Sequence, residues 1–195
     1  MGRWGPDHEL GTLNLITPQK RAQAGALVRE GISVTCSRLI VPEIAPDVTS
    51  IPPLHYMLKT GDSAPDAGAG GSSDFFGLSF HGLTITHLDA LCHMMHEGRL
   101  YNGYVRDDEV TEGGCDKLAI INFKQGIVTR GILMDIARLK GVEYLEPGTP
   151  IYVEDLEAWE REAGIRVGSG DVVLVRSGRW ARRAEVGPWR TGREA

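Results

Sequence analysis

A chain of 195 residues is long enough to bury a core of its own, so we expect a single domain over residues 1–195. Its apolar share of 42% and charged share of 24% are ordinary for a soluble globular protein, and a net charge of −5 argues against a nucleic-acid-binding surface. Other residues interrupt the late arginines of residues 176–193, which predicts a solvated face.

No apolar run is long enough to span a bilayer, and the N-terminus does not resemble a signal peptide. We therefore expect a cytoplasmic protein without a membrane partner. The three cysteines, Cys36, Cys92 and Cys115, are odd in number and form no C-x-x-C pair, which predicts free thiols in a reducing compartment. We expect Cys92 to be a small apolar filler.

The first predicted element is a helix over residues 18–30, because Thr17 followed by Pro18 is typical of an N-cap and a first helical position, and Gly31 is a stop. The inward side chains of this helix are predicted to be Ala22, Ala26 and Leu27. Alternation over residues 32–41 predicts a strand. Prolines in residues 42–53 exclude regular pairing except at a sheet edge.

Residues 55–58 are predicted to form a short strand. Residues 60–74 have the most flexible composition in the chain, rich in Gly, Ser and Ala. They directly precede the histidine-rich stretch described below, so they could form a mobile flap over a site. A surface connection without a function is equally compatible with this composition.

In the second half, residues 118–123 and 126–134 are predicted to be buried strands, followed by a short helix near residues 135–140. Leu156, Trp159 and Ala163 lie at helical spacing before Gly164, which predicts an amphipathic helix over residues 154–163. A strand buried on both faces is predicted at residues 171–176. Strands alternate with few helices, so the predicted class is α/β with a mixed β-sheet.

Four of the six histidines fall within residues 81–96. If residues 83–89 form a strand, the imidazole of His87 and the carboxylate of Asp89 point to the same face. Such a pair suits zinc or another first-row divalent metal. A helical turn capped by Asp89 would bring His93 back towards this face, as a proton-transfer group beside the metal.

The run T-H-L-D-A-L-C-H, followed by E-G-R-L-Y-N-G, resembles the metal-dependent cyclase-like hydrolase family, which includes kynurenine formamidase and isatin hydrolase. The family signature is H-x-G-T-H-x-D-x-x-x-H. Residues 4–14, 141–148 and 171–178 also look like the longer-chain bacterial branch. The resemblance implies His87 and Asp89 as ligands of a zinc or manganese ion, His93 as general base or acid, and homo-oligomers. It also implies a swivelling, barrel-like core.

The chain departs from the family pattern in two places. The first His of the signature would fall at Leu83, and its Gly at Ile85. His81 could supply the missing ligand if the chain bulges at Gly82, or it could contact substrate or be structural. Family members also usually continue beyond the point where this chain stops, so we expect either a fragment or a natural short form.

The predicted function is hydrolysis of a C–N bond in an amide, formamide or cyclic amide of a small molecule. His93 is the predicted catalytic residue, with His87, Asp89 and His81 on the metal. Trp4 and Phe80 are predicted to form an aromatic wall for the substrate. The alternative is a metal-binding but non-catalytic member with a structural or interaction role, which the residues at Leu83 and Ile85 favour.

Overall fold

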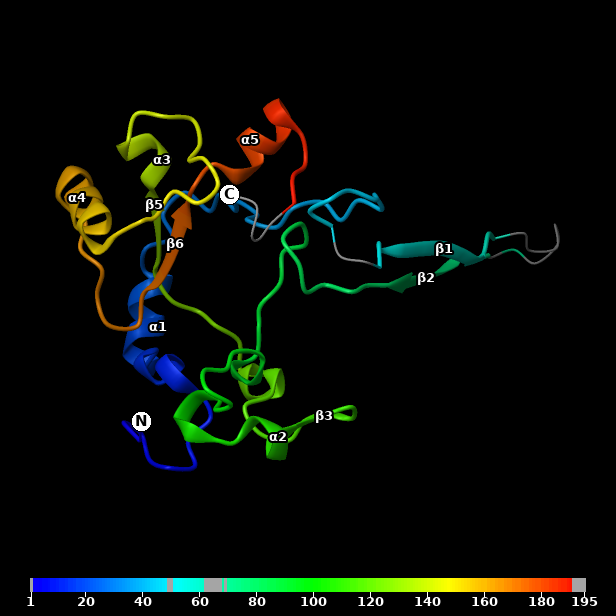
Figure 1. Ribbon diagram of the computed structural model, residues 1–195, viewed down its shortest axis with the longest axis horizontal. Coiled ribbons are helices and arrows are strands. Elements are labelled where there is room, and N and C mark those ends of the chain that lie inside the picture. The colour runs from blue at the N-terminus through cyan, green and yellow to red at the C-terminus, as the bar shows by residue number, and fades with distance from the viewer. Residues whose placement is uncertain (1, 49–50, 62–67, 69, 191–195) are drawn as a thin grey trace. The chain divides into compact units, whose positions relative to one another are not determined.

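The computed structural model describes residues 2–48, 51–61, 68 and 70–190 (Figure 1). By its internal contacts the chain divides into two compact units. The first unit comprises Met1–Ile32 and Leu88–Arg179, and the second comprises Ser33–His87 and Trp180–Ala195. Helices of the first unit are α1 (Pro18–Gly25), α2 (Arg106–Glu109), α3 (Ile136–Leu139) and α4 (Val153–Ala163), with short 3-10 helices at Gly11–Leu15, Leu91–His93, Tyr101–Gly103 and Ile120–Phe123. Its strands are β3 (Val110–Thr111), β4 (Gly114–Cys115), β5 (Gly131–Asp135) and β6 (Val172–Arg176).

Helix α1 begins where the sequence predicts, because the Thr17 side chain accepts a hydrogen bond from the Lys20 amide at 3.1 Å. It ends at Gly25, well before residue 30. Glycine is a weak helix former, and the helix buries no side chain whose packing could compensate. The predicted inward face is therefore wrong, since the exposed side chains include Ala22, Ala26 and Leu27.

Strands β5 and β6 pair in parallel, from Gly131 opposite Val172 to Asp135 opposite Arg176. The side chains of Ile132 and Met134 point to one face and are buried. They form a core with Ile136 of α3, and α4 packs against it. The strand predicted at residues 126–134 is thus confirmed only in its second half.

The other prediction for this sheet, that the strand at residues 171–176 is buried on both faces, is wrong. Val173, Leu174 and Val175 of β6 are all exposed by about two fifths or more of their surface. A strand needs elements on both of its faces to bury every side chain. This sheet has two strands, and its buried face carries Ile132 and Met134 of β5.

The two helices after β5, α3 and α4, form where the sequence predicts them. The Asp135 carboxylate accepts a hydrogen bond from the Arg138 amide at 3.0 Å and so caps α3. Helix α4 ends at Ala163 and is capped by Gly164, whose φ of 65° only glycine adopts easily. Leu156 and Trp159 pack against the core as predicted, whereas Ala163 is exposed.

A second core in the first unit surrounds Leu118, which is fully buried with Ala90, Cys92 and Leu100. The strand predicted at residues 118–123 does not form, because Leu118 has a positive φ of 62° and a 3-10 helix follows. The Leu118 amide donates instead to the Glu9 carboxylate at 2.6 Å. Burial works against ionisation of Glu9, but this hydrogen bond and that from Asn122 outweigh it and lower its pKa.

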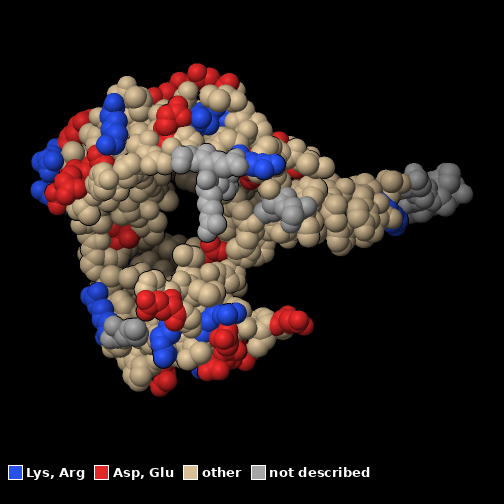
Figure 2. Space-filling model, in the orientation of Figure 1, with Lys and Arg blue, Asp and Glu red and all other residues tan. Residues whose placement is uncertain are grey.

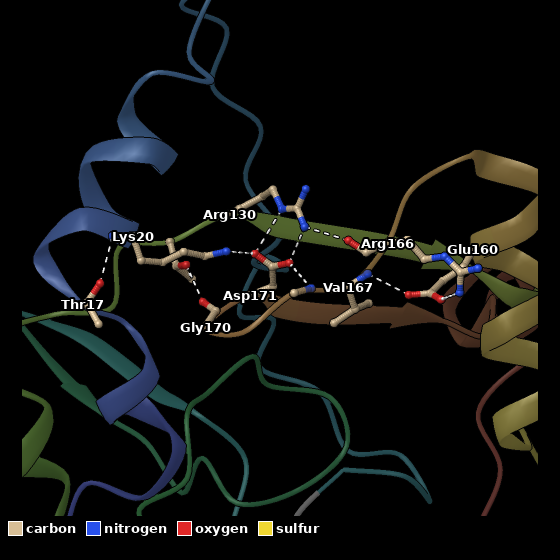
Figure 3. A network of polar contacts seen from close by, with 10 residues as sticks. Thr17, Lys20, Arg130, Glu160, Arg166, Val167, Gly170 and Asp171 are labelled. Atoms are coloured by element: carbon tan, nitrogen blue, oxygen red, sulfur yellow. Dashed lines mark hydrogen bonds and ion pairs between the residues drawn. The ribbon is translucent and has the colours of Figure 1, made fainter.

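A charged network ties three segments of the first unit together (Figure 3). The Asp171 carboxylate, which has no exposed surface, accepts hydrogen bonds from Lys20 of α1 and from the Arg130 Nε atom at 3.0 Å. It also accepts from the Gly168 amide at 2.7 Å. The Arg130 hydrogen bond, partly opposed by burial, and the bonds from Lys20 and Gly168 hold the Asp171 pKa far below its usual range.

In the second unit, β1 (Leu54–Lys59) and β2 (Ser73–Gly77) form an antiparallel hairpin. The strand predicted at residues 55–58 is therefore confirmed. Residues 62–67 and 69 lie outside the described residues, so the predicted flap at residues 60–74 stays a prediction, although β2 already begins inside it. Residues 32–41, predicted as a strand, form none, and no described strand pairs with them.

Helix α5 (Arg179–Val186) begins at the boundary of the two units and was not predicted. Arg183 donates to both carboxylate oxygens of Asp47, at 2.8 and 3.0 Å, and to Glu43 at 2.8 Å. The Asp47 side chain is fully buried and that of Arg183 is 15% exposed. The prediction that the late arginines form a solvated face is therefore wrong for Arg183, whose side chain is mostly buried and paired with Asp47.

The predicted α/β class holds, but the predicted single mixed sheet does not. The described strands form three separate two-stranded sheets, two antiparallel and one parallel. No closed sheet is present among the described residues, so a barrel-like core is not observed. The described helices are all too short or too polar to cross a membrane. On the face drawn in Figure 2, acidic and basic side chains are interspersed, without a basic stripe.

Candidate metal centre

The histidine-rich stretch is an irregular loop over residues 81–90, followed by the 3-10 helix Leu91–His93. The strand predicted at residues 83–89 does not form, because no described strand offers it hydrogen bonds. Ile85 anchors the loop, with 9% of its surface exposed, while His81, His87 and Asp89 are exposed around it. Asp89 also does not cap a helix, since Ala90 holds that position.

The loop nevertheless brings together the three predicted metal ligands. One ligand atom each from His81, His87 and Asp89 lies within 4.8 Å of the other two. Two imidazole nitrogens and a carboxylate oxygen are a donor set that suits zinc, manganese or a similar divalent ion. These residues therefore fit a metal, and His81 lies where a ligand replacing the one missing at Leu83 would be needed.

A backbone contact fixes which nitrogen of His87 could bind such an ion. The Nδ1 atom of His87 lies 2.8 Å from the carbonyl oxygen of Ile85. A carbonyl oxygen only accepts hydrogen bonds, so Nδ1 must carry the proton and donate. The lone pair is then on Nε2, and an orienting contact of this kind is usual for metal-binding histidines.

His93 leans back onto Asp89, as the sequence predicts for a helical turn. Its Nδ1 atom lies 3.2 Å from Oδ1 of Asp89, and the two side chains are 34% and 42% exposed. The contact holds the ring next to a predicted ligand while leaving it accessible to solvent. His93 is thus placed beside the His81, His87 and Asp89 group rather than within it.

The two predicted aromatic residues have different surroundings. Phe80 lies against the candidate ligands, with its ring centroid 4.5 Å from that of His81 and 5.7 Å from that of His87. Trp4 lies against His8 in the N-terminal segment, at 6.0 Å. His8 Nδ1 accepts a hydrogen bond from the Leu10 amide at 3.2 Å, as expected of a structural histidine.

A second group of metal-binding residue types, not predicted from the sequence, surrounds Cys92. Cys92 and Cys115 form a disulfide, so the prediction of free thiols is wrong for both, and only Cys36 is a free, exposed cysteine. Ligand atoms of Cys92, His93 and Cys115 also lie within 4.8 Å of one another. The adjacent Cys92 and His93 were a signal, but Cys115 lies 23 residues away and only folding brings it close.

Comparison with known proteins supports the resemblance seen in the motif. A crystal structure described as that of a novel cyclase matches with a TM-score of 0.83 and 28% sequence identity, covering 95% of this chain and 67% of the other. This chain thus spans about two thirds of that protein. A comparison with curated proteins finds no match. The family model described as "Putative cyclase" matches residues 26–194, and the chain therefore belongs to the putative cyclase family.

Proposed function

We propose that this protein is a metal-dependent hydrolase that cleaves a C–N bond in an amide, formamide or cyclic amide of a small molecule. The observation that carries the proposal is the grouping of His81, His87 and Asp89, with His93 bonded to Asp89 at 3.2 Å. These three residues would hold the ion. When bound, a divalent ion supplies a water of lowered pKa and a Lewis acid for a carbonyl group.

The side chains of the protein would perform the proton transfers. His93 would accept a proton from the attacking water and return it to the leaving nitrogen, so that the amine departs uncharged. Asp89 would orient the ring of His93 through their hydrogen bond. Phe80, beside His81 and His87, would offer an apolar wall to an aromatic or cyclic substrate.

A non-catalytic, metal-binding role is the second candidate. It is favoured by Leu83 and Ile85, which stand where the resembled signature has a histidine and a glycine. Both side chains are hydrocarbons, so neither offers a ligand atom to a metal or a hydrogen bond to a substrate.

The test combines elemental analysis of the purified protein with hydrolysis of a panel of N-formyl aromatic amines and cyclic amides. Stoichiometric metal together with turnover supports the hydrolase. Metal without turnover on any amide supports the non-catalytic role. Protein that neither retains nor takes up a divalent ion contradicts both.

A further inference from the structure

We propose a second metal site, formed by Cys92, His93 and Cys115, that exists only when the Cys92–Cys115 disulfide is reduced. The three ligand atoms lie within 4.8 Å of one another in the disulfide-bonded form. Two thiolates and an imidazole are a soft donor set, which binds zinc in preference to calcium or magnesium. The site therefore differs in chemistry from the His81, His87 and Asp89 group, which has no sulfur.

The backbone spacing of the two cysteines is compatible with both states. Their Cα atoms are 6.6 Å apart, which lies near the upper end of the range found for disulfides. Two sulfurs bound to one tetrahedral zinc ion stand about 3.8 Å apart, given a Zn–S distance near 2.3 Å. The two sulfurs must therefore move apart on opening, but a separation of about 3.8 Å still falls inside the 4.8 Å limit within which the three ligand atoms lie.

The surroundings hold the ligands in place after the sulfur–sulfur bond is broken. Cys92 is 2% exposed, within the core that includes Leu100 and Leu118, and its amide donates to the Leu118 carbonyl at 3.3 Å. Cys115 is half-buried on β4, which pairs with β3. His93 is oriented by Asp89 at 3.2 Å, the kind of carboxylate contact that supports metal-binding histidines.

Opening the site is a two-electron reduction. With a trialkylphosphine as reductant, the sulfur–sulfur bond breaks, the two sulfurs become thiols, and the phosphine becomes a phosphine oxide whose oxygen comes from water. That water also supplies the two thiol protons. Binding of a divalent cation then releases both protons, because thiolates are the metal ligands.

The second site competes with the proposed catalysis for one side chain. A cation held by Cys92, His93 and Cys115 occupies the imidazole that would otherwise move protons. Soft metal binding to the reduced protein should therefore inhibit hydrolysis. This consequence rests on the proposed function, whereas the metal site itself does not.

The experiment is a cobalt titration of the full chain, with and without phosphine treatment. Cobalt(II) reports thiolate ligation through a near-ultraviolet charge-transfer absorption that oxygen and nitrogen ligands do not produce. We expect the reduced protein to bind one more cobalt ion per chain than the oxidised protein and to show this absorption. Equal cobalt content in the two states, without the absorption, would overturn the proposal.

Variants separate this site from the first one. Cys115→Ser should lose the additional ion and the absorption, while the matched control Cys36→Ser, at the exposed free cysteine, should keep both. His87→Ala should remove the other ion but leave the thiolate absorption, so a failure of the first site is distinguishable from a failure of the second. Thiolate absorption that persists in Cys115→Ser would contradict the assignment. The comparison of oxidised and reduced wild-type protein needs no variant, so it stands even if a substitution prevents folding.

Discussion

Asp89 belongs to two interactions at once, and this sets the behaviour expected of the residues around it. Its carboxylate accepts a hydrogen bond from His93 at 3.2 Å, and it also supplies one of the three ligand atoms grouped with His81 and His87. A change at Asp89 should therefore affect metal retention and the orientation of His93 together. In the disulfide-bonded protein, a change at His93 should affect proton transfer and leave the His81, His87 and Asp89 group intact.

His93→Ala is expected to retain the metal and to slow hydrolysis by about a hundredfold to ten-thousandfold, the usual contribution of general acid–base catalysis. Elemental analysis and the rate on the most reactive amide of the panel would measure the two effects. His96→Ala is the matched control, because His96 is an exposed histidine of the same stretch outside both metal-binding groups. Loss of metal in His93→Ala to the same extent as in Asp89→Ala would make His93 a ligand instead.

Asp171→Asn is expected to lower the free energy of unfolding by about 3 kcal/mol at neutral pH, because it leaves Lys20 and Arg130 without their buried counter-charge. The pKa of Asp171 is lower in the folded than in the unfolded protein, where it is about 3.9. Its contribution to stability is thus fully present above about pH 4 and is lost as the pH falls further.

Urea unfolding of wild type and Asp171→Asn between neutral and acidic pH would measure this dependence. The difference between the two proteins should shrink below about pH 4. Glu162→Gln, at an exposed position on α4, should track the wild type throughout. A difference that stayed constant down to acidic pH would show that the charge of Asp171 does not provide the stability.

At the scale of elements, the parallel pair β5–β6 shows that alternate side chains of one strand point to the core and to solvent. In β5, Ile132 and Met134 are buried against α3 and α4, while Leu133 between them is 56% exposed. The ends of the two strands are joined by an ion pair, since Arg176 donates to Asp135 at 2.8 Å. Burial of Asp135 opposes its ionisation, but the Arg138 amide and Arg176 outweigh this and lower its pKa.

Met134→Ala should therefore cost about 2 to 5 kcal/mol of unfolding free energy, the usual range for a buried large-to-small change. Leu133→Ala, one position away on the same strand, should cost less than about 1 kcal/mol because its side chain is already half in water. Chemical denaturation of both variants gives the comparison. Similar losses at the two positions would mean that the exposed face of β5 is covered in the folded protein.

At the scale of the whole molecule, much apolar surface is exposed in the described residues. The chain spans about two thirds of the length of the solved cyclase. The hairpin β1–β2 exposes Leu54, Tyr56, Met57 and Phe76 by about half of their surface. A two-stranded hairpin alone is marginally stable in water, and clustered exposed apolar side chains commonly mark contacts between proteins.

We propose on this basis that the protein forms homo-oligomers. Light scattering coupled to gel filtration should give a mass of two or more times the 21.3 kDa of one chain. The double variant Tyr56→Ser, Phe76→Ser should shift the protein towards the monomer, whereas Val142→Ser, at an exposed site of the first unit, should not. A monomeric mass at all concentrations would refute the proposal.

The amino-acid sequence by itself determined the elements whose signals are local. Thr17 and Gly164 mark a start and an end that the structure retains. His93 contacts Asp89 as predicted, although the turn between them is a 3-10 turn that begins after Asp89. The family was also recognisable, because the motif from Thr86 to His93 is short, continuous and chemically specific.

Only the tertiary structure decided which segments pair. Residues 32–41 and 83–89 have suitable alternation but form no strand, because a strand requires hydrogen bonds from a partner that its own sequence does not encode. The grouping of His81 with His87 and Asp89 depends on a loop anchored by buried Ile85, not on strand parity. Cys115 reaches Cys92 through long-range packing around Leu118. The separation of 23 residues between the two cysteines does not by itself predict that they meet.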